Sequence, residues 1–141
     1  MTDTVSIKRR SEIMRNVKGK DTKPEIIVRK YLHNKGFRYR IHDKKLPGHP
    51  DIKLKKHKTV IFINGCFWHG HKECKIYVMP KTNVSFWEKK IEKNMLRDIE
   101  IINKLRLLKW NVIIVWECEL KPTKRNETLE NLVSKILVKE V

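Results

Sequence analysis

The stretch KTVIFINGCFWHGHKEC, residues 58–74, joins a run of apolar residues to a segment crowded with side chains that bind metals. Its first part, KTVIFIN, is rich in β-branched residues and predicts a central strand of a sheet. Its second part holds two cysteines, two histidines, a phenylalanine and a tryptophan. Because these side chains follow the strand directly, we expect them to gather at its carboxyl end.

Before this stretch the sequence predicts one helix and two extended segments. The helix in DTKPEIIVRKYLHNKG is expected to begin with Thr22 as its cap and Pro24 in its first turn, and to end at Gly36. FRYRIH, residues 37–42, alternates like a half-buried strand. LPGHP then predicts a turn, and DIKL resumes an extended run at Asp51.

After this stretch the sequence predicts a long helix over residues 86–108, a buried strand in WNVIIVWE and an amphipathic helix in ETLENLVSKILVKE. The expected apolar stripe of the long helix is Trp87, Ile91, Met95, Ile99, Ile102 and Leu105. The expected apolar face of the last helix is Leu129, Leu132, Val133, Ile136 and Leu137. The order helix, three strands, helix, strand, helix predicts a small mixed α/β sheet flanked by helices.

The composition indicates a basic protein with a single domain. At 141 residues the chain is long enough for one core, and we expect a basic arm over residues 1–20 and one domain over residues 21–141. No apolar run suggests a membrane span or a signal peptide, so a soluble, cytoplasmic protein is expected. The formal net charge of +17 favours nucleic acid as the partner, although a generically basic protein would have a similar charge.

The cysteines suggest a metal site. The chain has three cysteines: Cys66, Cys74 and Cys118. A disulfide is not expected in a cytoplasmic protein, and an odd number would leave one thiol over. Structural zinc takes four nitrogen or sulfur ligands, and His71 would complete such a set if the strand that ends near Cys118 lies beside the loop. His69 and His57 are alternative fourth ligands, and cysteines that pack as small apolar side chains are the alternative to a metal.

Asp51, at a turn-to-strand junction after a proline, is typical of nucleases that hold Mg²⁺ with an aspartate. Cleavage of a phosphodiester needs a hard cation, and it needs a group that exchanges a proton near neutral pH, for which histidine is suited. The segments MRNVKGKDTKPE, LPGHPDI, VIFINGCFWHGHKEC, FWEKKIEKN and VWECEL together resemble the very-short-patch-repair (Vsr) DNA mismatch endonucleases. The similarity runs in order from about residue 8 to residue 120.

The resemblance implies a restriction-endonuclease-like fold with a structural zinc site and a catalytic Mg²⁺. It implies that Asp51 and the main chain of Ile63 hold the Mg²⁺, and that His69 acts on the attacking water or the leaving group. Glu25 matches an acidic residue near that histidine, and a capping-box glutamate is its alternative role. The zinc ligands that the resemblance implies are Cys66, His71, Cys74 and Cys118.

Two further features concern the catalytic residues and the DNA contact. Asn64 departs from the family, whose best-known members carry histidine there, so this position either lacks an acid–base role or only hydrogen-bonds a phosphate or water. The resemblance also implies an aromatic wedge inserted beside the mismatch, where unstacking costs least. The matching residues are Phe67, Trp68, Trp87 and Met14. Burial in the core is the alternative for Phe67 and Trp68, and the apolar stripe of the long helix is the alternative for Trp87.

The resemblance implies an endonuclease that nicks one strand of double-stranded DNA beside the mispaired thymine of a T:G mismatch. Such nicking would start very-short-patch repair of deaminated 5-methylcytosine, with a cytosine-5 DNA methyltransferase as the functionally linked enzyme, and the protein is expected to be a monomer. One alternative is a site-specific nuclease of a restriction or mobile-element system that needs no mismatch. A second alternative is a zinc-containing DNA-binding module without catalysis.

Overall fold

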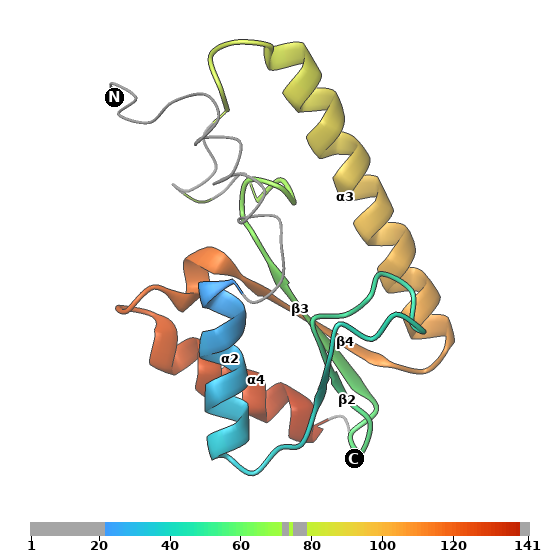
Figure 1. Cartoon of the computed structure of the whole chain (residues 1–141), viewed down its shortest axis with the longest axis vertical. Coiled ribbons are helices and arrows are strands. Elements are labelled where there is room, and N and C mark those ends of the chain that lie inside the picture. Colours follow the sequence, from blue (N-terminus) through green and yellow to red (C-terminus); the bar gives the residue numbers. More distant parts are fainter. Residues whose placement is uncertain (1–21, 72–73, 75–78, 139–141) are drawn as a thin grey trace.

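The computed structural model describes residues 22–71, 74 and 79–138 (Figure 1). The predicted basic arm, Met14 within it and the last residues of the predicted final helix lie outside this part of the chain. The elements run in the order α2 (Lys23–Asn34), β1 (Arg40–Ile41), β2 (Ile52–Leu54), β3 (Thr59–Asn64), α3 (Val84–Leu107), β4 (Asn111–Trp116), the short 3₁₀ helix η1 (Glu117–Leu120) and α4 (Arg125–Val138).

The described strands form one four-stranded sheet in the order β1-β2-β3-β4. The pairs β1–β2 and β2–β3 are antiparallel, whereas β3 and β4 run parallel. Parallel neighbours need a crossover connection, and α3 provides it by crossing one face of the sheet. Helices α2 and α4 lie side by side over the other face (Figure 1). The predicted mixed α/β sheet flanked by helices is confirmed.

The main core lies between the sheet and helices α2 and α4. Because both faces of the sheet are covered, β3 is apolar at successive positions instead of alternating with polar residues. The buried cluster takes residues from α2, from the turn after it, from three strands, from η1 and from α4: Val28, Leu32, Phe37, Ile52, Leu54, Ile61, Ile113, Val115, Leu120, Leu129, Leu132 and Ile136. This core holds α2 against the sheet, so that the first turn of α2 has a fixed position near the end of β3.

The predicted helix near Thr22 is confirmed at both ends. Thr22 Oγ1 accepts a hydrogen bond from the N–H of Glu25 at 3.4 Å. At the other end Gly36 takes φ +90°, and Phe37 donates its N–H to the carbonyl of Leu32 at 3.0 Å. Phe37 therefore belongs to the end of the helix and not to a strand.

The predicted strand over residues 37–42 was wrong in its extent, because only β1 (Arg40–Ile41) pairs with β2. At its first end Phe37 takes part in the helix-terminating hydrogen bonds. At its last end His42 adopts φ +48°, a left-handed conformation that no strand continues through. The sequence alternates as a strand would, but the end of α2 takes up its first residue and a tight bend at His42 ends it.

The predicted long helix is confirmed, but its predicted apolar stripe was wrong at Ile99, whose side chain is 57% exposed. Residues four apart in an α-helix are separated by 400°, so a run of such steps drifts about 40° around the axis each time. Residues seven apart drift back by only about 20°. Ile91 and Leu105 are buried accordingly, and the residue midway between them on this line is Asp98.

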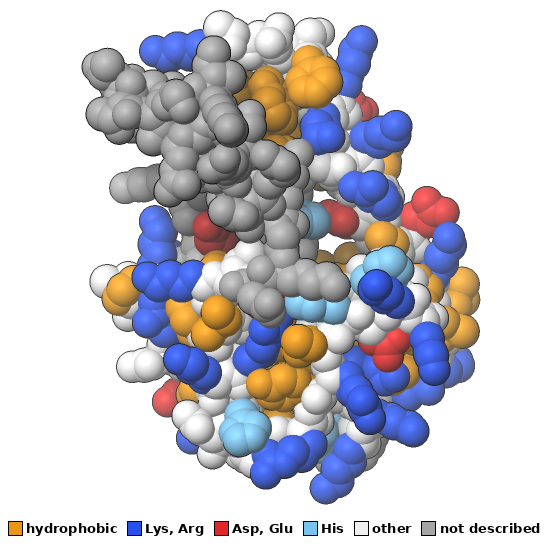
Figure 2. Space-filling model, viewed as in Figure 1, with side chains coloured by type: hydrophobic (Ala, Val, Ile, Leu, Met, Phe, Trp, Pro, Cys, Tyr) orange, Lys and Arg blue, Asp and Glu red, His pale blue; other side chains and the backbone are white. Residues whose placement is uncertain are grey.

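The surface of the described part of the chain is strongly basic. Lys and Arg side chains are spread around the outline of the face shown in Figure 2 and do not gather in one patch. Within the described residues no helix combines the length and the apolar character that crossing a membrane requires.

The packing of α4 gives a matched pair of neighbours for a stability test. Ile136 is fully buried in the core, whereas the adjacent Leu137, predicted on the apolar face, is 47% exposed. Ile136→Ala should lower the free energy of unfolding by about 2–5 kcal/mol, because it removes apolar contacts and leaves a cavity. Leu137→Ala should lower it by about 1 kcal/mol or less. Urea unfolding followed by circular dichroism would measure both, and equal losses would contradict this packing.

Candidate active site and metal centre

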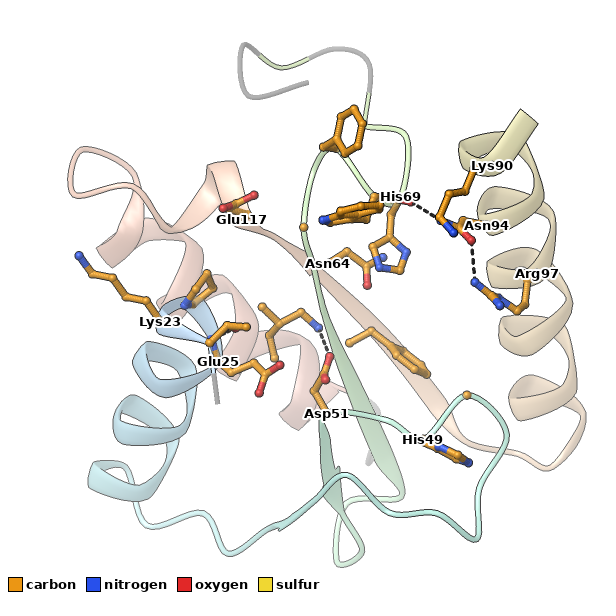
Figure 3. Close-up of a pocket in the computed structure, with 18 residues that line it drawn as sticks. Lys23, Glu25, His49, Asp51, Asn64, His69, Lys90, Asn94, Arg97 and Glu117 are labelled. Carbon is orange, nitrogen blue, oxygen red and sulfur yellow. Dashed lines mark hydrogen bonds between the residues drawn. The ribbon is translucent and has the colours of Figure 1, made fainter. Parts of the chain in front are cut away.

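A pocket opens beside the carboxyl end of β3, between the first turn of α2 and the middle of α3 (Figure 3). It is lined by most of the residues that the sequence predicted to act together: Glu25, Asp51, Ile63, Asn64, Phe67, Trp68 and His69. Helix α3 adds polar residues to the same pocket: Lys90, Asn94 and Arg97. The structure therefore brings residues from four separate segments to one place.

Asp51 directly precedes β2, and its side chain is hydrogen-bonded to the neighbouring strand. Its Oδ2 accepts a hydrogen bond from the N–H of Ile63 at 2.7 Å. Burial raises the pKa of Asp51 to about 6, against the opposing effect of the Ile63 hydrogen bond, and the nearby carboxylate of Glu25 raises it further. A carboxylate buried beside another carboxylate is poorly stabilised on its own, and a bound cation would relieve this repulsion.

Glu25 points into the site from the first turn of α2 (Figure 3). Its Oε2 accepts a hydrogen bond from Arg29 Nη2 at 2.7 Å and lies 3.2 Å from His42 Nε2. Its main-chain N–H is capped by Thr22. The main-chain N–H of Glu25 therefore takes part in the helix cap, while its carboxylate lines the pocket. Neither Arg29 nor His42 was predicted from the sequence, because each reaches the site only through this packing.

His69 is oriented by Asp98 of α3. Its Nδ1 lies 2.6 Å from Asp98 Oδ2, and both side chains are partly exposed. Because a carboxylate only accepts, Nδ1 carries the proton and Nε2 is left to exchange one. Asp98 was not predicted from the sequence. The spacing of seven residues from Ile91 to Asp98 and from Asp98 to Leu105 is the signal that marks it as facing inward.

The inner face of α3 also supplies cations and an amide near the pocket. Asn94 Nδ2 donates to the carbonyl of Trp68 at 3.0 Å, and Arg97 Nη2 donates to Asn94 Oδ1 at 2.6 Å (Figure 3). Lys90 and Arg97 both line the pocket, where they favour a negatively charged ligand. These residues were also missed, because in a chain so rich in lysine and arginine nothing local distinguishes them.

Three aromatic side chains meet at one edge of the pocket. The ring of Phe67 packs edge-on against Trp68, with centroids 5.1 Å apart, and against Trp87, with centroids 5.6 Å apart. Trp68 and Trp87 lie 5.8 Å apart. All three are only partly buried, so they are not core residues. The structure therefore brings together three of the four residues predicted for the wedge, and the fourth, Met14, is outside the described residues.

Asn64 is the last residue of β3 and is only 6% exposed. It lines the pocket between Asp51 and His69 (Figure 3). A buried amide in this position donates and accepts hydrogen bonds but does not exchange a proton at neutral pH.

The predicted metal ligands also come together. The Sγ atoms of Cys66, Cys74 and Cys118 and one ring nitrogen of His71 all lie within 4.8 Å of one another. The three cysteines form no disulfide. Four tetrahedral donors around a zinc ion, with sulfur ligands at ~2.3 Å, are separated by about 4 Å. Three thiols and one imidazole in this arrangement therefore fit a structural metal ion.

The surroundings of this Cys/His cluster support the choice of His71 over the other histidines. The His71 ring stacks on Trp116 with centroids 4.2 Å apart, and its Nδ1 lies 3.5 Å from Cys118 Sγ. His69 instead pairs with Asp98, and His57 packs against Phe37. Burial raises the pKa of the Cys66 thiol, so that Cys66 keeps its proton near neutral pH unless a cation favours the thiolate.

Comparison with known proteins gives consistent results. Residues 2–75 match the family model described as DNA mismatch endonuclease Vsr. The chain is 51% identical to the type II nicking enzyme V.NmeAIP of Neisseria meningitidis serogroup A, over 86% of each chain. It is 46% identical to the type II nicking enzyme V.XorIIP of Xanthomonas oryzae, over 85% of this chain and 88% of the relative. It is 40% identical to the DNA mismatch endonuclease Vsr of Escherichia coli, over 86% of this chain and 77% of the relative.

The raised pKa of Asp51 predicts a pH-dependent effect on stability. Because this pKa is higher in the folded chain than its ordinary value, Asp51 stabilises the fold when protonated and loses that contribution as the pH rises through about 6. Without added divalent cations, Asp51→Asn should therefore raise the Tm at pH 7.5. The increase should shrink as the pH falls toward 4, where Asp51 is itself neutral.

Asp43 provides the matched control, because its hydrogen bond from Lys53 lowers its pKa. Asp43→Asn should lower the Tm at pH 7.5, which is the opposite sign. Thermal melts of both variants at several pH values would measure the effect. An Asp51→Asn variant that is less stable than the wild type throughout this range would contradict the electrostatic account.

Proposed function

Because this chain belongs to the Vsr family of DNA mismatch endonucleases, we propose that it nicks one strand of duplex DNA beside the thymine of a T:G mismatch. Family membership makes it a DNA endonuclease, so the alternative of a non-catalytic DNA-binding module was wrong. The proposal adds the T:G specificity, the Mg²⁺ and zinc ions and the roles of the individual residues. It also places the nick at the start of very-short-patch repair of deaminated 5-methylcytosine.

The observation that carries the proposal is the arrangement of Asp51 and the His69–Asp98 pair around one pocket. A carboxylate fixed by a main-chain N–H and a histidine oriented through Nδ1 are the two groups that metal-assisted phosphodiester cleavage needs. The proposal includes the restriction-endonuclease-like fold of the family, which the mixed sheet between α3 on one face and α2 with α4 on the other supports.

A Mg²⁺ ion bound at this site would neutralise charge on the phosphate and lower the pKa of a bound water. Asp51 fits such an ion, because the Ile63 N–H fixes Oδ2 and because burial, with a smaller contribution from the Glu25 carboxylate, raises its pKa, so that a cation would favour its charged form. We propose that Asp51 and the main-chain carbonyl of Ile63 hold the ion. Glu25, whose carboxylate lies within 4.8 Å of that of Asp51, adds a second carboxylate to its surroundings.

His69 is proposed to handle the proton of the attacking water or of the leaving oxygen through Nε2. Asp98 keeps Nδ1 protonated and stabilises the imidazolium when Nε2 takes up a proton. Asn64 is proposed to hydrogen-bond a phosphate or water, because its amide cannot replace an acid–base histidine. Lys90 and Arg97, at the α3 side of the pocket, are placed to contact the phosphate backbone.

The aromatic edge of the pocket is proposed to insert beside the mismatch. Phe67, Trp68 and Trp87 form a partly exposed cluster next to the catalytic groups. Unstacking a base step costs a few kcal/mol, and it costs least at a mispaired base, so such an insertion selects mismatched sites. Met14 and the basic arm over residues 1–20 are proposed to contact the same DNA. The enzyme is proposed to act as a cytoplasmic monomer, functionally linked to a cytosine-5 DNA methyltransferase.

The catalytic assignment predicts which variants bind DNA without nicking it. On T:G-containing duplexes with Mg²⁺, His69→Ala should reduce the nicking rate by ~10²–10⁴ because it removes the proton-transfer group. Asp51→Ala should reduce the rate at least as much, because it removes the cation ligand. Both should retain affinity for mismatched DNA in gel-shift assays, and EDTA should stop nicking by the wild type.

The control substrate is a matched duplex of the same sequence. Nicking of matched and mismatched duplexes at equal rates would favour the alternative of a site-specific nuclease without mismatch dependence. Wild-type nicking rates for Asp51→Ala would remove the active-site assignment.

The Cys/His cluster is proposed to hold a structural zinc ion. Purified protein should then contain one zinc per chain, because the four donors come from one copy of the chain. Cys118→Ser should lose the zinc and lower the Tm, because binding free energy of a structural metal is folding free energy. His69→Ala is the control, since His69 lies in the same loop but outside the donor set, and it should keep zinc. Elemental analysis that finds no zinc in active protein would contradict the assignment.

A further inference from the structure

His42 forms a three-sided cluster with the two carboxylates of the proposed active site. One ligand atom from each of Glu25, His42 and Asp51 lies within 4.8 Å of the others. The Nε2 atom of His42 is 3.2 Å from Glu25 Oε2 and 4.0 Å from Asp51 Oδ1. The oxygen of Asp51 that faces His42 is the one not bound to the Ile63 N–H.

The main chain holds His42 in this position. Arg40 and Ile41 pair with Lys53 and Ile52, and the next step of that antiparallel register sets His42 opposite Asp51. The His42 N–H donates to the Asp51 carbonyl at 3.3 Å. His42 also has φ +48°, a conformation that costs energy for a residue other than glycine and that is retained where the surroundings impose it.

The distances within the cluster suit a six-coordinate divalent cation. With ligand distances of ~2.1 Å, adjacent donors lie about 3 Å apart and opposite donors about 4.3 Å apart. The contact between His42 and Glu25 matches an adjacent pair, and the contact between His42 and Asp51 needs only a small adjustment to match an opposite pair. The carboxylates of Glu25 and Asp51 also supply negative charge that favours a divalent cation.

Among the described residues, the neighbouring cation Arg29 balances part of that charge. Its Nη2 lies 2.7 Å from Glu25 Oε2 and 3.3 Å from His42 Nε2. Within the described residues one guanidinium lies beside the two carboxylates. Arg29 contacts the same Glu25 and His42 atoms that would bind a cation, so a bound cation would replace these contacts.

The position of His42 relative to the pocket indicates how it would act. Glu25 and Asp51 line the pocket, whereas His42 is not one of the lining residues, and its side chain is 14% exposed. A phosphate in the pocket would meet the carboxylates first. A cation between these residues would keep its open positions toward the pocket, because Glu25 and Asp51 line it.

We propose that His42 is a nitrogen ligand of the catalytic divalent cation, together with Glu25 and Asp51, and that the site prefers Mn²⁺ to Mg²⁺. This inference rests on the proposed metal-dependent nicking, and it specifies which divalent cation the nicking uses. Mg²⁺ strongly prefers oxygen ligands, whereas imidazole nitrogen favours first-row transition metals. A mixed nitrogen and oxygen donor set should therefore discriminate between the two ions.

The test observes the cation directly with Mn²⁺ as the probe, in zinc-loaded protein. Pulsed electron paramagnetic resonance of bound Mn²⁺ should show modulation from a coordinated ¹⁴N nucleus in the wild type. His42→Gln should lose this modulation and bind Mn²⁺ at least about tenfold more weakly, whereas its affinity for Mg²⁺ should change much less. His33→Gln, an exposed histidine near the end of α2, is the matched control and should behave as the wild type.

A measurement without any substitution guards against a variant that fails to fold. Labelling the histidines of the wild type with ¹⁵N should replace the ¹⁴N modulation with that of ¹⁵N. Any of three results would overturn the inference. The ¹⁴N modulation could survive in folded His42→Gln, or the wild type could show no nitrogen coupling. His42→Gln could also lose affinity for Mn²⁺ and Mg²⁺ equally.

Nicking assays on the same samples separate this inference from the proposed function. Mn²⁺ should support nicking of a T:G duplex at lower concentration than Mg²⁺ in the wild type, and this preference should narrow in His42→Gln. His42-dependent Mn²⁺ binding without nicking would contradict the proposed function and support the assignment of His42. Nicking without a nitrogen ligand would support the proposed function and overturn the assignment of His42.

Discussion

The parallel pairing of β3 with β4 is the constraint on which the rest of the site depends. Because the two strands run in the same direction, their carboxyl ends leave the sheet at the same edge, where Asn64 pairs with Trp116. The loop that begins at Cys66 and the turn that contains Cys118 therefore start side by side, and Glu117 accepts a hydrogen bond from the N–H of Cys66. An antiparallel pairing would send these segments to opposite edges, and the cysteines would not meet.

The same pairing decides where α3 lies. A parallel pair needs a long crossover, and here it is a helix that runs across the sheet and passes the loop after β3. Gly70 brings the loop so close to the helix that an added Cβ would lie 2.5 Å from Met95 Sδ. This close approach sets Asp98 beside His69 and Asn94 beside the carbonyl of Trp68. The crossover is thus both a covering helix and one wall of the pocket.

Much of this arrangement follows from local patterns in the sequence. The apolar run before Asn64 predicted β3, and the ligand-rich stretch after it predicted a site at the end of that strand. The cap at Thr22 and the helix end at Gly36 were predicted for the same reason, because each depends only on residues a few positions away. The convergence of the Cys/His cluster followed from ligand chemistry together with one assumption about strand adjacency, which the sheet order confirms.

What local patterns did not predict depends on contacts between distant segments. His42 reaches Asp51 only because β1 and β2 pair in one particular register, and a two-residue strand gives that register no recognisable pattern. Asp98 is a charged residue on a highly charged helix, and only its partner in a different segment distinguishes it from its neighbours. The stripe predicted through Ile99 was wrong because steps of four residues turn slowly around the helix axis, whereas the sheet and the loop contact a nearly straight line along it.

The length of the loop between Cys66 and His71 is tightly constrained by the structure. All four residues between them are constrained by geometry, since Phe67 and Trp68 form the aromatic edge, His69 meets Asp98, and Gly70 takes φ +69° against α3. One inserted residue would turn every later side chain to a new direction while Cys66 stayed anchored at the end of β3. Divergence among such chains is therefore expected to accumulate as substitutions within this loop and as insertions elsewhere, at exposed turns such as the one before β3 that contains Lys55 and Lys56.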